Sequence, residues 1–516
     1  MSSDSIAPSP EKKQVAEPTR RSFVAGGIAT AGLGGFTALR RPGHPASSAA
    51  RGGRDPWEIL ARSISGPVVR PGDPGYAALA LPYNLRVASI RPAGIALCRS
   101  ARDVATSIRW ARKYHFPLIG RSGGHSAAGY SVTTGLMIDT KLMRQASFDT
   151  ATRIATIAGG VRNAGVYQAL QQNDATITHG RCPTVGASGF LLGGGIGFNI
   201  RTLGIASDAL VSSQIVTADG EILTLSNKQN RDLFWACRGG GGGNFGINTS
   251  FSIRTVPAPR SVTASRLTWT AKIDKVLPAL MAALYESPVR LGTWTTLDAV
   301  TPQQLAKGED VTVFFEGQLL GTPAELRRIL APVYAVEKPS ESTTKEMGYW
   351  QAQKFFSDVE DPTEFQNRGF YFCGPISHGA IHTMLYWLRR WPGTSVYARV
   401  SFLRTGGRAN AVPPHATAFV HRDNEWYMLW YLKWGEEDSK AVVAENLAWL
   451  SAFYDSIAPY ALPQTYQNFT DPSLKDYLLQ YYGSNLPRLE RVKSAVDPAR
   501  VFNFPQAIPP RHHRLL

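Results

Sequence analysis

Short apolar runs, each followed by a polar or glycine-rich turn, fill the first half of the chain after residue 54. Runs of this length and content predict β-strands. They span residues 85–89, 94–97, 116–120, 136–139, 153–158 and 175–178. Two more predicted strands, 214–218 and 221–225, meet at Asp219-Gly220, a dipeptide typical of a hairpin turn. The pattern indicates a domain of short strands.

Helical periodicity interrupts these strands in two segments. Across residues 99–115, Val104, Ile108 and Ala111 fall on one helical face, and Ser100 is placed to cap the first turn. A second helix is predicted over residues 162–172. The first half is therefore predicted to be an α+β domain with glycine-rich loops.

The clearest alternation of the second half lies within residues 421–435. A strand there would place two sets of side chains on opposite faces. One set, which we expect in the core, is Trp426, Met428, Trp430, Leu432 and Trp434. The other set contains the candidate substrate contacts Tyr427, Tyr431 and Lys433, although an amphipathic strand with a solvated outer face predicts the same pattern.

Length and charge narrow the function classes. With 516 residues and 43% hydrophobic side chains, the chain can bury the cores of two domains. The net charge is +16, of which the first 54 residues carry +5 (eight Lys and Arg against three Asp and Glu), leaving +11. The basic residues are spread without a long run, which favours a solvated basic surface and predicts no nucleic-acid partner. Four cysteines without C-x-x-C spacing predict neither a metal site nor a disulfide scaffold.

The N-terminus has the pattern of a twin-arginine export signal. Arg20 and Arg21 precede Phe23, and a moderately apolar stretch over residues 24–39 leads to small residues before Arg51. That stretch is shorter than the roughly 20 residues of a membrane-spanning helix. We therefore expect residues 1–50 to be a signal and linker, the twin-arginine machinery to be a partner, and the mature protein to be periplasmic or extracellular.

Three glycine-rich runs, beginning at residues 120, 180 and 237, suit the close approach of a phosphate-bearing ligand. The run Gly193-x-Gly195-x-Gly197 lacks the third glycine of the Rossmann spacing, and the sequence contains no P-loop motif, so neither of these nucleotide-binding folds is supported. Two of the runs also carry a nucleophilic side chain, His125 in one and Cys182 in the other.

Five motifs together resemble the berberine-bridge-enzyme-like flavin oxidases, of the vanillyl-alcohol-oxidase or PCMH type of FAD-binding fold. They are "RSGGHS" at 121, "CPTVG" at 182, "GGGIG" at 193, "LFWACRGGGGGNFGI" at 233 and "YYGSNLPRLERVKSAVDPARVFNFPQAI" at 481. The resemblance implies an FAD-binding domain over residues 55–258 and a substrate domain over 259–455, with an antiparallel sheet covered by helices. Residues 456–516 would return to the FAD domain.

The same resemblance implies that FAD is attached twice, by His125 at its 8α-methyl group and by Cys182 at C6. Both side chains are nucleophiles able to add to an electron-poor ring. A backbone-bonded loop histidine and an inert buried thiol are the structural alternatives. The other implied cofactor contacts are Arg121, Ser122, Gly123, Gly124, Ser126, Gly186, Gly189, Gly193, Gly194, Gly197, Ile247 and Asn503.

The catalytic base is where the sequence departs from the family. Many members carry Tyr-x-Asn-Tyr, whose second tyrosine acts as base or as part of a tyrosine pair, whereas this chain has phenylalanine there, Phe469. Tyr466, Tyr130 and the tyrosines of the substrate sheet are the candidates that remain, and a regular strand would put Tyr466 on the face opposite Phe469. Val185, three residues after Cys182, stands at a position that influences oxygen access in related enzymes, where valine is associated with oxidases.

The expected function is therefore an exported, bicovalently flavinylated oxidase. It would oxidise an alcohol-bearing small molecule, such as a sugar, an oligosaccharide or a secondary metabolite, with O2 as electron acceptor and H2O2 as product. Two alternatives stay open: a dehydrogenase with another acceptor, and a flavin-bound protein without catalysis. The oligomeric state is not predicted.

Overall fold

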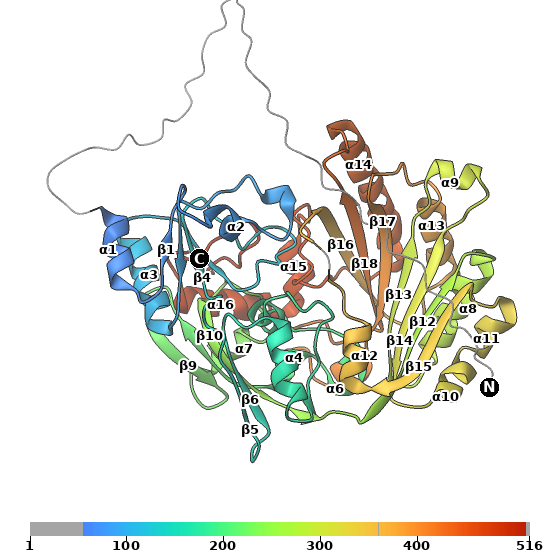
Figure 1. The fold of residues 1–516 in the computed structure, drawn as a ribbon, viewed down its shortest axis with the longest axis horizontal. Helices are drawn as coiled ribbons and strands as arrows, with labels where there is room; N and C mark the ends of the chain where they lie inside the picture. Colours follow the sequence, from blue (N-terminus) through green and yellow to red (C-terminus); the bar gives the residue numbers. More distant parts are fainter. Residues whose placement is uncertain (1–54, 360, 512–516) are drawn as a thin grey trace, which may run out of the picture. The chain divides into compact units, whose positions relative to one another are not determined.

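The structure is a computed structural model that describes residues 55–359 and 361–511, so the predicted export signal lies outside the described residues. Helices and antiparallel sheets are both present, which confirms the predicted α+β class (Figure 1). None of the helices in the described ranges is long and apolar enough to span a membrane.

Two sheets form the core of the first half. The four-stranded sheet has the order β1 (Val68–Val69), β2 (Gly94–Leu97), β4 (Leu136–Asp139), β3 (Leu118–Arg121), with β4 parallel to both β2 and β3. The antiparallel five-stranded sheet has the order β5 (Ala146–Asp149), β6 (Ile154–Ala158), β10 (Ile247–Arg254), β8 (Leu210–Val216), β9 (Ile222–Ser226). A small sheet pairs β11 (Val256–Pro257) with β7 (Ala175–Thr176).

Short helices connect these strands. The longest, α3, begins after Ser100, whose hydroxyl accepts from the Asp103 N–H as the sequence predicts. The helices of this half are α1 (Pro56–Ser63), α2 (Tyr76–Ala80), α3 (Ala101–Lys113), α4 (Asn163–Gln171), α5 (Ala187–Leu192), α6 (Ile200–Leu203) and α7 (Arg231–Ala236), with 3₁₀ turns η1 (Leu85–Val87) and η2 (Ala206–Ala209).

The second half is built on one antiparallel seven-stranded sheet. Its order is β15 (Glu341–Gly348), β12 (Ser261–Trp269), β14 (Thr312–Leu319), β13 (Leu291–Asp298), β17 (Tyr397–Arg404), β18 (Trp426–Trp434), β16 (Glu364–Phe372). The 3₁₀ turn η3 (Gly407–Ala409) lies in the connection between β17 and β18. The strand predicted within residues 421–435 is β18.

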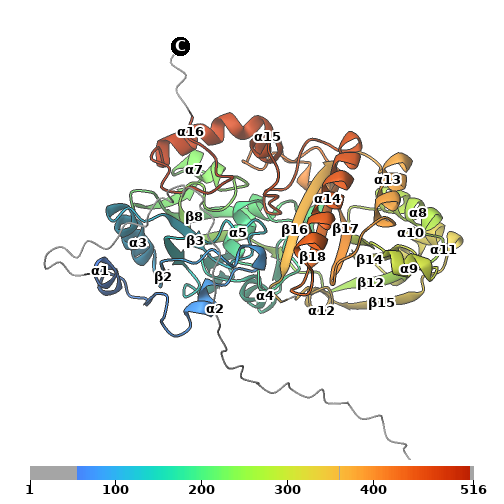
Figure 2. The same ribbon diagram turned by 90° about the horizontal axis from the view of Figure 1, so that it is seen from above.

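Helices cover the outer face of this sheet (Figures 1 and 2). Trp426, Met428 and Trp430 lie in the core cluster between sheet and helices, which confirms the face predicted from their alternation. The helices of this half are α8 (Ile273–Tyr285), α9 (Pro302–Ala306), α10 (Pro323–Ile329), α11 (Ala331–Val336), α12 (Tyr349–Phe355), α13 (His378–Leu388) and α14 (Lys440–Ile457).

The C-terminal segment packs on the first half of the chain. It contains η4 (Ala458–Tyr460), α15 (Tyr477–Tyr482), η5 (Gly483–Asn485) and α16 (Leu486–Val496). Leu489 and Val492 of α16 share a core cluster with Phe234 of α7, and both views place α16 beside α7 (Figures 1 and 2). The chain therefore closes back on the sheets with which it began.

The strand predicted over residues 85–89 is wrong. Residues 85–87 form η1, because the Asn84 side chain accepts from the Arg86 N–H and closes a turn. Residues 465–469 also turn, with the Phe469 N–H donating to the Tyr466 carbonyl at 3.0 Å. Of the predicted domain limits, residue 258 lies between β11 and β12, whereas residue 455 lies inside α14.

Candidate functional site

A large cavity of about 840 Å³ lies between the sheets of the first half and the inner face of the seven-stranded sheet. Loops after β3, before α5 and before β10 line it from one side, and β13, β16, β17 and β18 line it from the other. The C-terminal segment adds residues 466–470 and part of 481–506. Its volume is that of a site for a cofactor together with a small substrate.

Most of the residues predicted from the motifs line this cavity. They are Arg121, Ser122, Gly123, Gly124, His125, Ser126, Tyr130, Cys182, Val185, Gly186, Gly189, Gly197, Ile247, Tyr431 and Tyr466. Five predicted residues are outside its lining, namely Gly193, Gly194, Tyr427, Lys433 and Asn503.

Other side chains cover the two glycines, whereas Asn503 lies at the surface. Asn468 covers Gly193, where an added Cβ would lie 2.0 Å from its Oδ1, and Phe419 packs on Gly194 in the same way. Asn503 is exposed and accepts from Arg500 instead.

The two residues of β18 point toward the predicted side but lie behind other rings. The Tyr427 ring is parallel to that of Phe469 at 5.8 Å, and Phe469 lines the cavity. The Lys433 ammonium lies 5.1 Å from the ring centroid of Tyr397, which also lines the cavity.

The loop that carries His125 presents unused backbone donors. In the described structure, the backbone N–H groups of residues 122–126 donate to no protein acceptor. Successive free N–H groups of this kind form a concave site for an anion. Gly123 and Gly186 bring two glycine loops together at this point, since a Cβ on Gly123 would stand 2.2 Å from the Gly186 nitrogen.

One carbonyl oxygen ties four segments together beneath the same loop. The hydroxyls of Ser122, Thr140 and Ser188 donate to the Gly159 carbonyl at 2.8, 3.1 and 2.6 Å. A carbonyl oxygen has two lone pairs, so three donors occupy its full accepting capacity and hold the Gly159 carbonyl in one position. The floor of the cavity is therefore held by side chains from β3, β4 and α5 and their flanking loops.

His125 and Cys182 meet at one hydroxyl. Thr184 Oγ1 lies 3.0 Å from His125 Nε2 and 3.1 Å from Cys182 Sγ. The Tyr83 ring stacks on the imidazole, with centroids 3.9 Å apart. Burial, with Arg162 and Arg121 nearby, lowers the pKa of His125 to about 4, so the imidazole is neutral near pH 7 and keeps a free electron pair.

Tyr466 also faces the cavity, with two hydrogen-bond donors at its phenol oxygen. The Gly195 N–H donates to it at 2.8 Å and Asn468 Nδ2 at 3.0 Å. Burial raises the pKa of Tyr466 above its usual value, and these donors act in the opposite direction. Because residues 466–469 turn, Tyr466 and Phe469 both line the cavity, and the expectation of opposite faces is wrong.

Tyr130, the other candidate base, stands at the C-terminal side of the lining. Its ring centroid is 5.2 Å from that of Phe504, and burial raises its pKa to about 12. No donor to its hydroxyl is seen in the described residues, so its phenolate would be less stabilised than that of Tyr466.

The inner face of the seven-stranded sheet forms a polar wall. Asn367, Tyr431, Arg399 and Asp298 are register neighbours across β16, β18, β17 and β13, and all four line the cavity. Arg399 and Asp298 form an ion pair of 2.9 Å. Beside them, the Thr296 and Ser401 hydroxyls are 2.9 Å apart. A substrate on this wall meets hydroxyl, amide and charged groups.

Sequence reasoning missed several lining residues. Asn468 stands inside the Tyr-x-Asn pattern, and Asn244, Phe504 and Gln506 stand inside the last two motifs, so the motifs could have identified all four as lining residues. Asn367, Arg399 and Asp298 lie on strands far apart in sequence, and only the sheet register brings them into one row.

The lining suits FAD on chemical grounds. The free N–H groups of residues 122–126 match a pyrophosphate, and an added Cβ at Gly189 would meet nothing within 4 Å, so this glycine leaves open space at the cavity wall. A neutral imidazole and a thiol are brought to one point of the same cavity.

Comparisons with known proteins agree with this chemistry. Residues 92–226 match the family described as FAD binding domain, and residues 465–509 match the one described as Berberine and berberine like. The FAD-linked oxidoreductase YvdP of Bacillus subtilis (strain 168) is 31% identical over 459 residues, covering 87% of this chain and 98% of that protein. The chain belongs to the berberine-bridge-enzyme-like FAD-linked oxidoreductases. The family expected from the motifs is thus confirmed.

Solved structures show the same fold for this berberine-bridge-enzyme-like protein. BBE-like 1 of Physcomitrella patens superimposes with a TM-score of 0.80 at 26% identity, covering 89% of this chain and all of that one. A glucooligosaccharide oxidase of Acremonium strictum gives 0.79 at 25% identity, covering 88% and 98%. The protein is an FAD-dependent oxidoreductase.

Proposed function

We propose that this berberine-bridge-enzyme-like protein is an oxidase that holds FAD by two covalent bonds, through His125 and Cys182, and oxidises an alcohol carbon of a small molecule. The observation that carries the proposal is the meeting of His125 and Cys182 at the Thr184 hydroxyl, at 3.0 and 3.1 Å, inside the cavity. The A. strictum glucooligosaccharide oxidase is described as containing 6-S-cysteinyl, 8α-N1-histidyl FAD, which supports the same pair of bonds here.

Bound FAD would supply a hydride acceptor at N5 and, once reduced, pass its electrons to O2 to give H2O2. The protein would hold it by contacts of three kinds. The N–H groups of residues 122–126 would bind the pyrophosphate, His125 and Cys182 would hold the ring system, and the Gly123–Gly186 contact would keep both loops close to it. Fixing the ring leaves the polar wall free for substrate.

Tyr466 is the base in this proposal. It accepts the proton of the substrate hydroxyl while the substrate carbon loses its hydride, so the alcohol becomes a carbonyl. The Gly195 N–H and Asn468 Nδ2 stabilise the phenolate that this role requires. Burial raises the pKa of Tyr466, so we expect turnover to increase toward alkaline pH as more phenolate forms.

The substrate is proposed to be a sugar, an oligosaccharide or a secondary metabolite that meets the wall of Asn367, Tyr431, Arg399 and Asp298. Two relatives fit these classes. The reticuline oxidase of Papaver somniferum is 25% identical over 473 residues, and the xylooligosaccharide oxidase of Thermothelomyces thermophilus is 28% identical over 461. Val185, which lines the cavity, is proposed to leave O2 access to the flavin.

Attachment is tested on denatured protein. The wild type and the single variants His125→Ala and Cys182→Ala should keep yellow flavin in the acid-precipitated pellet, because one bond remains in each variant. The double variant should release it. Cys373→Ala, which removes an exposed thiol outside the cavity lining, is the matched control. If flavin washes off the wild type on denaturation, the bicovalent assignment is wrong.

Activity is tested by adding xylobiose, cellobiose, benzylic alcohols and (S)-reticuline in air while flavin absorbance and peroxide are recorded. Bleaching with peroxide release supports the oxidase. Bleaching without peroxide supports a dehydrogenase with another acceptor. A flavin that no panel member bleaches supports a binding protein without catalysis, an alternative favoured by Phe469 in place of the family tyrosine.

Export by the twin-arginine pathway is part of the proposal and rests on Arg20 and Arg21 ahead of an apolar stretch. Folded export suits a protein whose cofactor is attached before transport. Replacing both arginines by lysine should retain the flavinylated protein in the cytoplasm, as measured by cell fractionation. Equal export of the variant and the wild type would contradict this assignment.

A further inference from the structure

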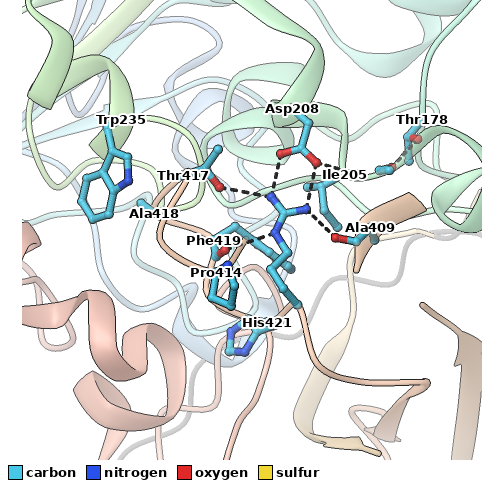
Figure 3. Close-up of polar contacts among 12 residues, drawn as sticks. Thr178, Ile205, Asp208, Trp235, Ala409, Pro414, Thr417, Ala418, Phe419 and His421 are labelled. Carbon is cyan, nitrogen blue, oxygen red and sulfur yellow. Dashed lines mark hydrogen bonds and ion pairs between the residues drawn. The ribbon is translucent and has the colours of Figure 1, made fainter. Parts of the chain in front are cut away.

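A buried ion pair joins the two halves of the protein behind the cavity. Arg422 Nη2 and Nη1 donate to the two carboxylate oxygens of Asp208 at 2.6 and 2.8 Å, in the bidentate arrangement that gives such pairs a fixed geometry. The Arg422 side chain is 0% exposed and that of Asp208 is 17% exposed. Figure 3 shows the dashed contacts that reach the Asp208 carboxylate.

The guanidinium has no spare donor. Its three remaining N–H groups donate to the Ala409 carbonyl at 3.0 Å, the Thr417 hydroxyl at 3.1 Å and the Phe419 carbonyl at 3.3 Å (Figure 3). A guanidinium offers five donors, so all of them are used. Arg422 thereby fixes both the connection between β17 and β18 and the carboxylate of Asp208.

Asp208 belongs to η2, and η2 holds the glycine turn that precedes it. The Asp208 carboxylate accepts from the Ile205 N–H at 3.3 Å. The Ser207 N–H donates to the Gly194 carbonyl at 2.8 Å, and the Ala206 N–H donates to the Gly195 carbonyl at 2.9 Å. The turn is thus attached to η2 by two backbone bonds.

One peptide unit connects this anchor to the cavity. The Gly194 carbonyl and the Gly195 N–H belong to the same planar peptide, so their directions are coupled. The carbonyl is held by Ser207, and the N–H donates to the Tyr466 phenol oxygen at 2.8 Å. Gly195 has φ +86°, a left-handed conformation that favours glycine, and an added Cβ would lie 2.6 Å from that of Ala206.

We propose that the Arg422–Asp208 ion pair is a positioning device for Tyr466, acting through η2 and the Gly194–Gly195 peptide. It rests on the proposed function, in which Tyr466 is the base. The connection between two strands of the substrate sheet thereby determines where an N–H of the flavin-binding half points. The two halves of the protein must therefore be packed together for the Gly195 N–H to donate to Tyr466.

The test variant is Asp208→Asn, which keeps the size of the side chain and removes its charge. In its crystal structure, the Gly195 N to Tyr466 Oη distance should exceed 3.5 Å, against 2.8 Å here. With the panel substrate that is turned over fastest, kcat should fall about tenfold while KM stays within about twofold, a loss of transition-state rather than ground-state binding. The rise of kcat toward alkaline pH should move to higher pH, because loss of the Gly195 donor raises the pKa of the Tyr466 phenol.

A double-mutant cycle tests whether the effect of Asp208→Asn on kcat depends on Tyr466. In a Tyr466→Phe background, Asp208→Asn should cause no further loss of kcat. Arg422→Lys, which keeps the charge but loses the fork, should lie between wild type and Asp208→Asn, and it serves as the second variant if Asp208→Asn does not fold. Asp310→Asn, which breaks an ion pair with Arg389 outside the cavity lining, is the control and should leave kcat and its pH profile unchanged.

Two results would overturn the proposal in distinguishable ways. If Asp208→Asn lowers kcat equally in the wild-type and Tyr466→Phe backgrounds, or leaves the Gly195 to Tyr466 bond at 2.8 Å, the positioning role is wrong while Tyr466 can still be the base. If Tyr466→Phe itself retains wild-type kcat, the base assignment fails and the positioning role fails with it. Flavin absorbance and the melting temperature of every variant show that cofactor loading and folding are comparable.

Discussion

Lys493 of α16 is expected to be one of the most sensitive positions in the chain, and Lys493→Met is the perturbation that shows it. Its ammonium donates to the Asn244 carbonyl at 2.6 Å, to Asp497 Oδ2 at 2.7 Å and to the Phe502 carbonyl at 2.8 Å. The side chains of Lys493 and Asp497 are 1% and 0% exposed. Asn244 lines the cavity, so this pair links the returning C-terminal segment to the glycine-rich loop.

The magnitude follows from what the substitution leaves behind. Methionine fills the space but removes all three donors. Among the described residues, the buried Asp497 carboxylate then keeps only the Val501 and Phe502 N–H groups as partners. Breaking a buried pair from one side costs about 3–5 kcal/mol of the free energy of unfolding. Lys272→Met is the control, because the Lys272–Glu337 pair is 58% and 27% exposed and such a pair contributes about 1 kcal/mol or less.

The assay is urea-induced unfolding of both variants, followed by tryptophan fluorescence, with flavin absorbance recorded on the same samples. We expect the Lys493→Met midpoint to fall well below that of Lys272→Met, with an unchanged slope. Equal midpoints for the two variants would refute the reasoning. In that case the buried pair contributes no more than an exposed one, and the C-terminal segment is held by apolar packing alone.

Three further predictions concern the cavity. Burial and two nearby arginines lower the pKa of His125 to about 4, so attachment of FAD to flavin-free Cys182→Ala protein should be constant from about pH 8 to pH 5 and fail only near pH 4. Attachment is measured as the flavin retained after acid precipitation. A decline centred on the ordinary histidine pKa near 6.5 would contradict this prediction. Tyr431→Ala should raise KM, whereas Lys433→Met should leave KM within about twofold because Lys433 is outside the cavity lining. The assay is steady-state kinetics with the best panel substrate. An equal effect of the two variants would contradict substrate binding at the polar wall. Val185→Leu should slow reoxidation of the flavin by O2 without slowing its anaerobic reduction by substrate, as measured by stopped-flow absorbance. An equal change in both half-reactions would contradict a role of Val185 in oxygen access.

Local chemistry allowed much of the first half to be predicted from the sequence. The cap at Ser100 involves groups three residues apart, so the start of α3 is visible in the sequence, and the apolar run 136–139 is β4 as predicted. The motifs also led to His125, Cys182 and Tyr466, which line the cavity. Glycine runs could be assigned to a ligand because few other residues allow such close approach of two backbones.

Tertiary structure decided which of these residues reach the cavity. Alternation along β18 correctly separated Trp430 from Tyr431, but it could not show that Phe469 covers Tyr427, because a covering ring comes from a segment far away in the chain. The same limit applies to the Arg422–Asp208 pair, whose partners are 214 positions apart. Periodicity determines the face on which a side chain lies, whereas packing between distant elements determines what that face meets. Thus the sequence alone determined the nucleophiles and their glycine loops, and only the folded chain brought His125 and Cys182 to one hydroxyl and Gly195 to Tyr466.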